Sequence, residues 1–145
     1  MSFWDSSAIV PALSIQATSS IVRDLLREGD EMVVWWGTWT ECAIAISRLK
    51  REGSWGEEYE EETRAALDGL AASWLEVEPT NELRLLAMLV SKIYPLKAAD
   101  CLQLAAALRW CEGDTEGAGF VCLDNRLRQA AEDEGFEVLP ESEKF

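Results

Sequence analysis

The sequence predicts an α/β fold, in which a parallel sheet carries helices on both faces. Short β-branched and aromatic runs alternate with single helices or pairs of helices along the whole chain, and this alternation is typical of such a sheet. A length of 145 residues suits one core, and a composition of 48% hydrophobic and 28% charged residues indicates a folded chain. We expect residues 1–145 to form a single domain.

Three strands are expected in the N-terminal half. The β-branched and aromatic run "MVVWW" (32–36) predicts a buried strand, while "SFW" before Asp5 and the run at 74–79 predict two shorter strands. Apolar residues at helical spacing predict helices in the segments between them. These helices are expected over residues 6–13, 17–28, 38–52 and 56–74, with Gly29 ending the second and Gly53 the third.

The C-terminal half continues the alternation. A helix built almost wholly from Ala, Leu and Cys follows Lys97, and two further segments have helical periodicity. Two compact apolar runs predict the last two strands. The expected elements are helices over 81–93, from after Lys97 to Trp110, and over 125–135 up to Gly135, a loop over 111–119, and strands over 120–123 and 136–140.

Charge and the lack of histidine restrict the chemistry. The chain has no histidine, which excludes the commonest general base and the commonest zinc ligand. Its formal net charge is −14, from 27 acidic and 13 basic residues. Phosphate binding depends on cations, so this charge argues against non-specific affinity for nucleic acid and favours metal ions or a basic protein partner. A surface that is acidic only for solubility explains most of the charge equally well.

The cysteines and the hydropathy pattern indicate the compartment. The four cysteines are widely spaced, form no C-x-x-C pair and lie in apolar contexts, which predicts buried, reduced thiols. No apolar run approaches the roughly 18 residues that a membrane span requires. The N-terminus has no basic region before its apolar part, so no secretory signal is expected. We expect a cytoplasmic protein without a membrane partner.

Four acidic residues are expected to meet beyond the carboxyl ends of the strands, where open parallel sheets bind their ligands. Asp5 directly follows "SFW", and Asp124 directly follows "FVCL". Glu41 and Asp100 lie in the first turns of their helices, which should open toward the same edge of the sheet. An aspartate at a strand end can also cap the following helix, and the two roles are compatible.

Asp100 is stronger evidence for an acidic binding site than Glu41. Glu41 follows Thr38 in a Thr-x-x-Glu pattern, so a capping box is the simpler explanation for it. Asp100 interrupts an apolar helix that leaves it little access to water, where an uncompensated carboxylate costs roughly several kcal/mol. Four carboxylates in one pocket repel one another, and Mg²⁺ or Mn²⁺ would cancel that repulsion. A pair of such ions can promote phosphodiester hydrolysis without any histidine.

Basic side chains near this pocket are weaker evidence for a binding site than the acids are. Lys97, Arg126 and Arg128 flank the proposed pocket and are candidates for holding neighbouring phosphates, although ordinary surface charge explains them equally well. A second basic cluster is expected to lie farther away, at the surface. It consists of Arg48, Lys50 and Arg51.

Seven tryptophans are many for this length. Core packing explains best those in expected strands and helices, namely Trp35, Trp36 and Trp110. Three others are candidates for a rim that stacks bases or packs a partner helix, namely Trp4, Trp39 and Trp55. Packing, within the chain or against a partner, is favoured over base stacking.

Four segments, taken in order, resemble the PIN-domain ribonucleases, and specifically the VapC-type toxins of toxin–antitoxin pairs. They are "FWDSSAIVPAL", "VVWWGTWTECAIAISRLKREG", "YPLKAADCLQLAAALRW" and "FVCLDNRLRQAAEDEGFEVLP", which together span nearly the full length. The resemblance implies a three-layer α/β/α sandwich with a central, mostly parallel sheet of four to five strands. It also implies RNA cleavage with Mg²⁺ or Mn²⁺, a homodimer, and a cognate antitoxin whose C-terminal segment, expected to be basic, blocks the site.

The resemblance assigns the acidic site residue by residue. It implies that Asp5, Asp100 and Asp124 bind the metal, and that Glu41 completes the catalytic set. A hydroxyl residue after the first aspartate is usual, and Ser6 or Ser7 fills that place. The candidates for substrate positioning are Ser6, Ser7, Lys97, Asn125, Arg126 and Arg128.

The chain departs from the family pattern beside Asp124. Many relatives carry Ser or Thr where this chain has Cys122, and many carry a further acid where this chain has Asn125. Both changes put a second metal in doubt. These departures favour a single metal over a pair in the resting state.

Other classes of protein explain the sequence less well. A haloacid-dehalogenase-like phosphatase requires a second aspartate where Ser7 stands, and a response-regulator receiver requires a further acid and a late lysine that the chain does not place. The remaining alternative is a catalytically silent PIN-like binding module. All four acids are present, which favours the enzyme.

Overall fold

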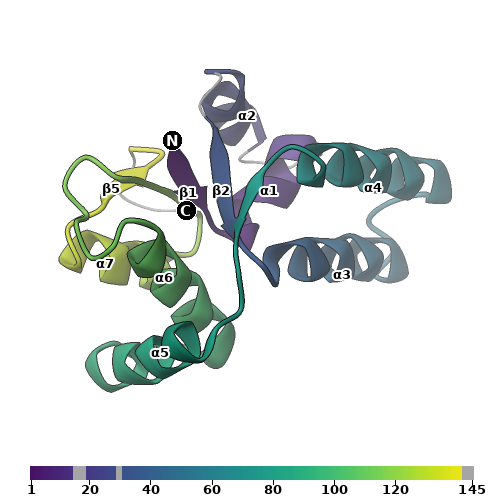
Figure 1. The fold of residues 1–145 in the computed structure, drawn as a ribbon. Coiled ribbons are helices and arrows are strands. Elements are labelled where there is room, and N and C mark those ends of the chain that lie inside the picture. The colour runs from purple at the N-terminus through teal and green to yellow at the C-terminus, as the bar shows by residue number, and fades with distance from the viewer. Residues whose placement is uncertain (15–18, 29–30, 142–145) are drawn as a thin grey trace.

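A five-stranded, all-parallel sheet forms the centre of the computed structural model, which describes residues 1–14, 19–28 and 31–141 (Figure 1). The strand order is β3-β2-β1-β4-β5. The strands are β1 (Ser2–Trp4), β2 (Met32–Trp35), β3 (Leu75–Val77), β4 (Gly119–Val121) and β5 (Glu137–Leu139). The parallel sheet confirms the predicted fold class.

Helices cover both faces of the sheet (Figure 1). Helices α1 to α4 lie on one side, and α5 to α7 on the other. Their bounds are α1 (Ser6–Leu13), α2 (Ser19–Arg27), α3 (Thr38–Arg51), α4 (Glu57–Ala71), α5 (Asn81–Ile93), α6 (Ala98–Trp110) and α7 (Asn125–Asp133). The expected start of the second helix at residues 17 and 18, and its end at Gly29, lie outside the described residues.

Two hydrophobic cores lie on opposite faces of the sheet, because successive side chains of a strand point to opposite sides. In β1, Phe3 packs with α5, α6 and α7, whereas Trp4 packs with the helices of the other face. Val33 and Val34 of β2 divide in the same way. Both faces are buried in the central strands β1, β2 and β4, which therefore have largely apolar runs rather than an alternating pattern.

The ends of the strands correct some of the predictions. The fourth strand ends at Val121 rather than at Leu123, so Cys122 and Leu123 form a short connection to Asp124. Trp36 was expected in the core but is exposed, because it lies one residue beyond the last residue of β2 and outside the covering helices. Trp4 was a candidate for an exposed rim but is buried, because its side chain points into the core under α1.

Two further properties concern the helices and the thiols of the described residues. None of the helices in the described ranges combines the length and the apolar character that crossing a membrane demands. The four cysteines are free thiols, of which Cys42, Cys101 and Cys122 are buried and Cys111 is partly buried.

Candidate active site

A cleft at the carboxyl end of the sheet brings the four predicted acids together. Asp5 and Asp124 come from the connections after β1 and β4, Glu41 comes from α3, and Asp100 from α6. The cleft has a volume of about 650 Å³, and Ser6 and Ser7 also line it. Elements far apart in the sequence thus form one acidic site, which we call the acidic cleft.

Asp5 is the most deeply buried of the four acids, with 2% of its surface exposed. It is the N-cap of α1, and its Oδ2 accepts a hydrogen bond from the backbone N–H of Ser7 at 3.1 Å. Its own N–H donates to the carbonyl of Val121 in β4 at 2.9 Å, and the thiol of Cys122 lies 3.6 Å from Oδ2. Burial raises the pKa of Asp5, and the charge of Asp124 adds to this.

Glu41 is held by hydrogen bonds from two other elements. Its Oε1 accepts from Nε2 of Gln103 at 3.0 Å, and its Oε2 accepts from the Ser6 hydroxyl at 3.3 Å. Burial, followed by the charge of Asp5, raises the pKa of Glu41 to about 7. The capping box proposed for Glu41 does not form, because Gly37 is the N-cap of α3 and the Thr38 hydroxyl instead accepts from Gln103 at 3.0 Å.

Gln103 is a site residue that the sequence reasoning did not single out. It lies in α6 one turn after Asp100, is fully buried, and donates to both Thr38 and Glu41. Its side-chain oxygen has no hydrogen-bond partner among the described residues. A polar residue inside an otherwise apolar helix was the available signal, since a buried amide requires hydrogen-bond partners.

Asp100 and Asp124 form the more accessible part of the cleft. Asp100 is half-buried rather than shielded from water, because it lies in the first turn of α6 and lines the cleft. Burial, followed by the charges of Asp5 and Asp124, raises the pKa of Asp100 to about 6, while Lys97 opposes this. Asp124 is exposed and is the N-cap of α7, with its Oδ1 accepting from the Leu127 N–H at 3.0 Å.

The basic residues around the cleft differ from those predicted. Arg128 is buried, and its guanidinium donates to the carbonyl oxygens of Cys122, Leu139 and Pro140 at 2.7 to 3.1 Å, so it does not face the cleft. Arg48, which was assigned to a more distant surface, lines the cleft. The other three positioning candidates, Lys97, Asn125 and Arg126, are exposed beside the cleft without lining it.

The chemistry of the cleft matches a hard divalent cation. Its donors are carboxylate oxygens, and their mutual repulsion contributes to the raised pKa values of Asp5, Glu41 and Asp100. A bound cation would remove that repulsion. As the described side chains stand, however, no three of the carboxylates and thiols are close enough to hold one ion.

The comparisons with known proteins identify the family. The PIN domain family model matches residues 3–141, so the chain belongs to the PIN domain family, whose members are generally nucleases. A comparison with curated protein sequences finds no match.

Solved structures share the fold at low sequence identity. A toxin–antitoxin complex from Klebsiella pneumoniae is similar with a TM-score of 0.64, 15% identity and 99% coverage of both chains. The FitAcB crystal structure from Neisseria gonorrhoeae gives a TM-score of 0.66, 15% identity and 97% coverage of both chains. FitAB bound to an IR36 DNA fragment gives a TM-score of 0.65 and 14% identity, covering 96% of this chain and 94% of that one.

Proposed function

We propose that the chain is an endoribonuclease that depends on Mg²⁺ or Mn²⁺ and hydrolyses RNA phosphodiester bonds in the acidic cleft. The observation that carries the proposal is the convergence of four carboxylates from four separate segments in one cleft. Membership of the PIN domain family supports nuclease chemistry in general. The choice of RNA rests on the resemblance to VapC-type toxins.

The residues of the cleft take distinct roles in this proposal. Asp5, Asp100 and Asp124 hold the metal, and Glu41 orients the metal or its water through an oxygen fixed by Gln103. A divalent ion held there would supply an activated water and would stabilise the leaving oxygen. Ser6 orients Glu41 by donating a hydrogen bond to it. Ser7 connects the segments that follow β1 and β4, because its hydroxyl accepts from the Leu123 N–H at 2.9 Å. Arg48 faces the cleft and is the better candidate for a substrate phosphate than Arg128.

We further propose that this nuclease is the toxin of a toxin–antitoxin pair and acts in the cytoplasm as a homodimer. The similarity in fold to a chain from a toxin–antitoxin complex supports an antitoxin partner. A net charge of −14 favours association with a basic antitoxin segment. Large apolar side chains exposed on α5, namely Leu85, Met88, Leu89 and Ile93, are consistent with a protein interface.

The test is RNA cleavage by the purified protein without its antitoxin. We expect cleavage with Mn²⁺, none with EDTA, and none by Asp5→Ala with Mn²⁺. Asp133→Ala is the matched control, because Asp133 is an exposed aspartate of α7 outside the cleft, and this variant should cleave like the parent. Metal-independent cleavage, or full activity of Asp5→Ala, would contradict the proposal.

A second candidate is a PIN-like domain without activity that acts as a binding module. One observation favours it, namely that no three described carboxylates or thiols are arranged to hold an ion. Calorimetric titration with Mn²⁺ separates the two candidates. Binding that Asp5→Ala and Asp100→Asn both abolish supports the nuclease, whereas a parent that binds no metal supports the silent module.

A further inference from the structure

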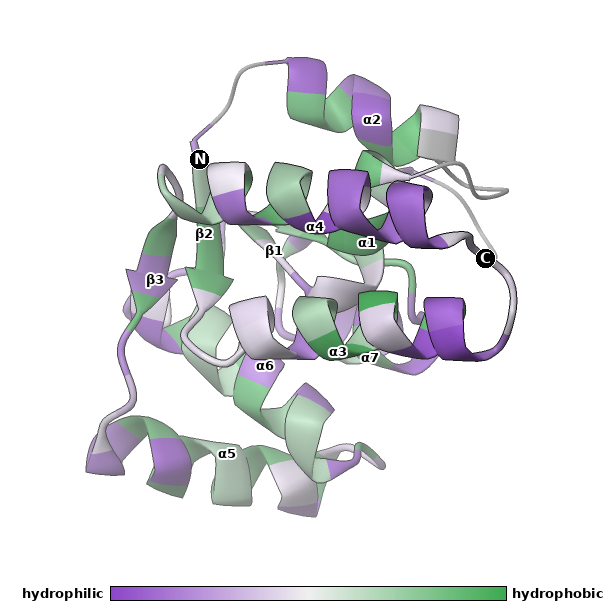
Figure 2. Ribbon diagram, turned by 90° about the vertical axis from the view of Figure 1, so that its right-hand side faces the viewer, coloured by the Kyte–Doolittle hydropathy of each residue, from purple (hydrophilic) through white to green (hydrophobic). Residues whose placement is uncertain are grey.

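A second groove lies between α3 and α4, next to the acidic cleft. We call it the tryptophan groove, because Trp39 lines it together with Ala43, Ile44, Arg51 and Arg64, and its volume is about 540 Å³. The two helices pack side by side, with α3 also carrying Glu41 (Figure 2). The groove and the acidic cleft thus use adjacent faces of one helix.

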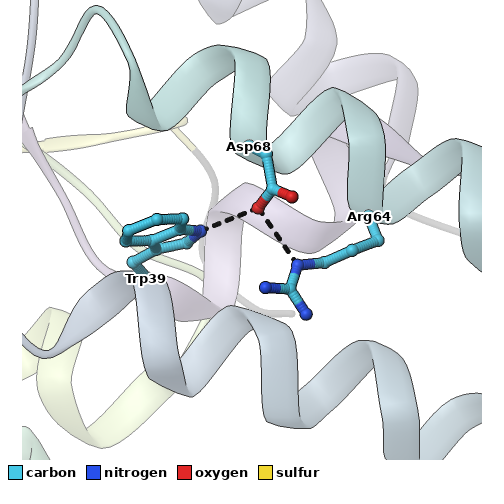
Figure 3. Close-up of polar contacts among 3 residues, drawn as sticks. All are labelled: Trp39, Arg64 and Asp68. Atoms are coloured by element: carbon cyan, nitrogen blue, oxygen red, sulfur yellow. Dashed lines mark hydrogen bonds and ion pairs between the residues drawn. The ribbon is translucent and has the colours of Figure 1, made fainter.

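The indole ring of Trp39 is exposed and yet fixed in orientation. Its Nε1 donates to Oδ1 of Asp68 at 3.0 Å, and the same oxygen accepts from Nε of Arg64 at 3.0 Å (Figure 3). These two hydrogen bonds lower the pKa of Asp68, so the carboxylate that anchors the ring stays charged. Trp39 nevertheless keeps 43% of its surface exposed. An oriented, exposed indole is a suitable platform for a flat ligand, because little side-chain freedom is lost on binding.

The charge of the groove points to an anionic ligand. Within the described part of the chain, the charged side chains of its lining are Arg51 and Arg64. They stand out in a chain whose formal net charge is −14. Guanidinium groups beside an exposed aromatic ring match the two parts of a nucleotide, since the ring stacks on a base and the guanidinium binds a phosphate.

The groove is continuous with the acidic cleft. Ile44 is 59% exposed and lines both, and Arg48, one turn farther along α3, lines the cleft. A strand whose phosphate lies in the cleft can therefore extend over Ile44 into the groove. A partner helix would fit less well, because such a helix buries a broad apolar face and the apolar lining of the groove is limited to the side chains of Trp39, Ala43 and Ile44.

We infer that the tryptophan groove binds single-stranded RNA next to the scissile phosphate, with Trp39 stacking on a base and Arg51 and Arg64 binding phosphates. This inference rests on the proposed ribonuclease function. It adds a second contact region outside the carboxylates. It also explains how a strongly acidic protein retains an RNA strand, since Arg51 adds positive charge beside the cleft and Arg64, although paired with Asp68 through Nε, keeps further N–H donors for a phosphate.

The first test measures affinity without cleavage. The probe is a fluorescein-labelled, single-stranded oligouridylate of about 12 nucleotides, followed by fluorescence anisotropy in EDTA. We expect Trp39→Ala to weaken binding by about five- to a hundredfold, and Trp39→Phe to retain most of the affinity. Trp36→Ala is the matched control, because Trp36 is 53% exposed but lies at the end of β2 outside the groove, and it should bind like the parent.

The second test concerns the phosphate contact of Arg64. Arg64 pairs with Asp68, Arg109 pairs with Glu82, and both arginine side chains are 46% exposed, so Arg109→Gln is a matched control for Arg64→Gln. Arg64→Gln should weaken binding and reduce the slope of log affinity against log salt by about 0.7, the value for one phosphate contact on a single strand. Arg109→Gln should change neither. A purely structural role for Arg64 would leave the salt dependence unchanged.

The outcomes separate this inference from the proposed function. If the parent cleaves RNA with Mn²⁺ but Trp39→Ala binds the oligouridylate like the parent, the inference is overturned and the proposed nuclease function is kept. The groove would then be a candidate site for a protein partner. If the parent neither cleaves RNA nor binds the probe, both are overturned. Loss of affinity in Trp39→Ala together with retained affinity in Trp36→Ala supports the groove as an RNA site.

Discussion

The acidic cleft has two halves that are built in different ways. The inner half consists of Asp5 and Glu41, whose carboxylates are fixed by Ser6, Ser7 and Gln103. The outer half consists of Asp100 and Asp124, which are more exposed and approach the cleft from the two helix starts of α6 and α7. The chain thus orients both inner carboxylates and, through the cap bond from Leu127, that of Asp124. A ligand therefore contributes most to the position of Asp100, whose carboxylate accepts no hydrogen bond among the described residues.

The largest effect is expected from Asp5→Asn in the inner half. Removing a carboxylate that binds the proposed metal should reduce RNA cleavage with Mn²⁺ by at least about a hundredfold. Asparagine is also a good N-cap, and it relieves the buried like charge, so the metal-free variant should unfold at the same or a higher temperature than the parent. Cleavage assays in Mn²⁺ and thermal unfolding in EDTA measure the two effects. Activity equal to that of the parent would remove Asp5 from the site.

Gln103→Leu tests whether the inner half depends on its buried amide. The variant loses both hydrogen bonds to Thr38 and Glu41, and we expect activity or Mn²⁺ affinity to fall by about 10- to 100-fold. Stability should fall by about 1 to 2 kcal/mol, because the buried Thr38 hydroxyl loses its partner and the removal of the unpaired Gln103 oxygen offsets this only in part. Circular dichroism and calorimetry separate the two readouts.

A double-mutant cycle is the control for this prediction. If Gln103 acts through Glu41, then Gln103→Leu should have little further effect on activity in a Glu41→Gln background. Equal losses in both backgrounds would show that Gln103 affects activity by another route.

The pH dependence of stability addresses both halves together. The pKa of Glu41 is about 7 and that of Asp100 about 6, both above their unfolded values of roughly 4. Between these values the folded state binds more protons, so the free energy of unfolding of the metal-free protein should fall as pH rises from about 4 through 7. Because both side chains are partly exposed and screened by solvent, we expect a loss of about 1 to 2 kcal/mol in total.

Denaturant unfolding in EDTA at about pH 5 and about pH 8 measures this loss. Glu41→Gln should flatten the profile, and saturating Mn²⁺ should reverse it, because metal ligands must be deprotonated. A metal-free protein that becomes more stable toward pH 8 would contradict the raised pKa values.

The smallest effect is expected from Cys122→Ser, at the boundary of the two halves. The thiol lies 3.6 Å from Oδ2 of Asp5 and accepts from the Asp124 N–H at 3.4 Å. A hydroxyl donates a stronger hydrogen bond to a carboxylate, which should lower the pKa of Asp5 and change Mn²⁺ affinity by less than about tenfold. Calorimetry measures the change, with Cys111→Ser as the control at a partly buried thiol outside the cleft. Equal changes in both variants would rule out a specific contact.

Most of the fold could be predicted because its signals are local. Residues 81–93 form α5 with the predicted bounds, since the helical spacing and the N-cap Thr80 lie within a few residues of each other. The convergence of the acids followed from a general property of parallel sheets, so the location of the cleft was predictable too.

The remaining features depend on contacts between distant segments. Gln103 acquires its role only because α6 packs where its amide reaches Thr38 in α3. The positions of Arg48 and Arg128 depend on which side of a helix faces the cleft, and Arg128 lies on the buried side of α7. Such assignments require the packing angles of the helices, which spacing along the sequence does not define.

The buried guanidinium of Arg128 links the outer half of the cleft to the edge of the sheet. It donates hydrogen bonds to the carbonyl oxygen of Cys122, two residues before Asp124, and to those of Leu139 and Pro140 at the end of β5. The N–H of Cys122 also donates to the carbonyl oxygen of Leu139. The edge strand and the segment that carries Asp124 should therefore open and close as one cooperative unit, with a common rate of hydrogen exchange. Local unfolding of the sheet edge would then displace Asp124 and break the contact of Leu123 with Ser7, while Asp100 keeps its place on α6.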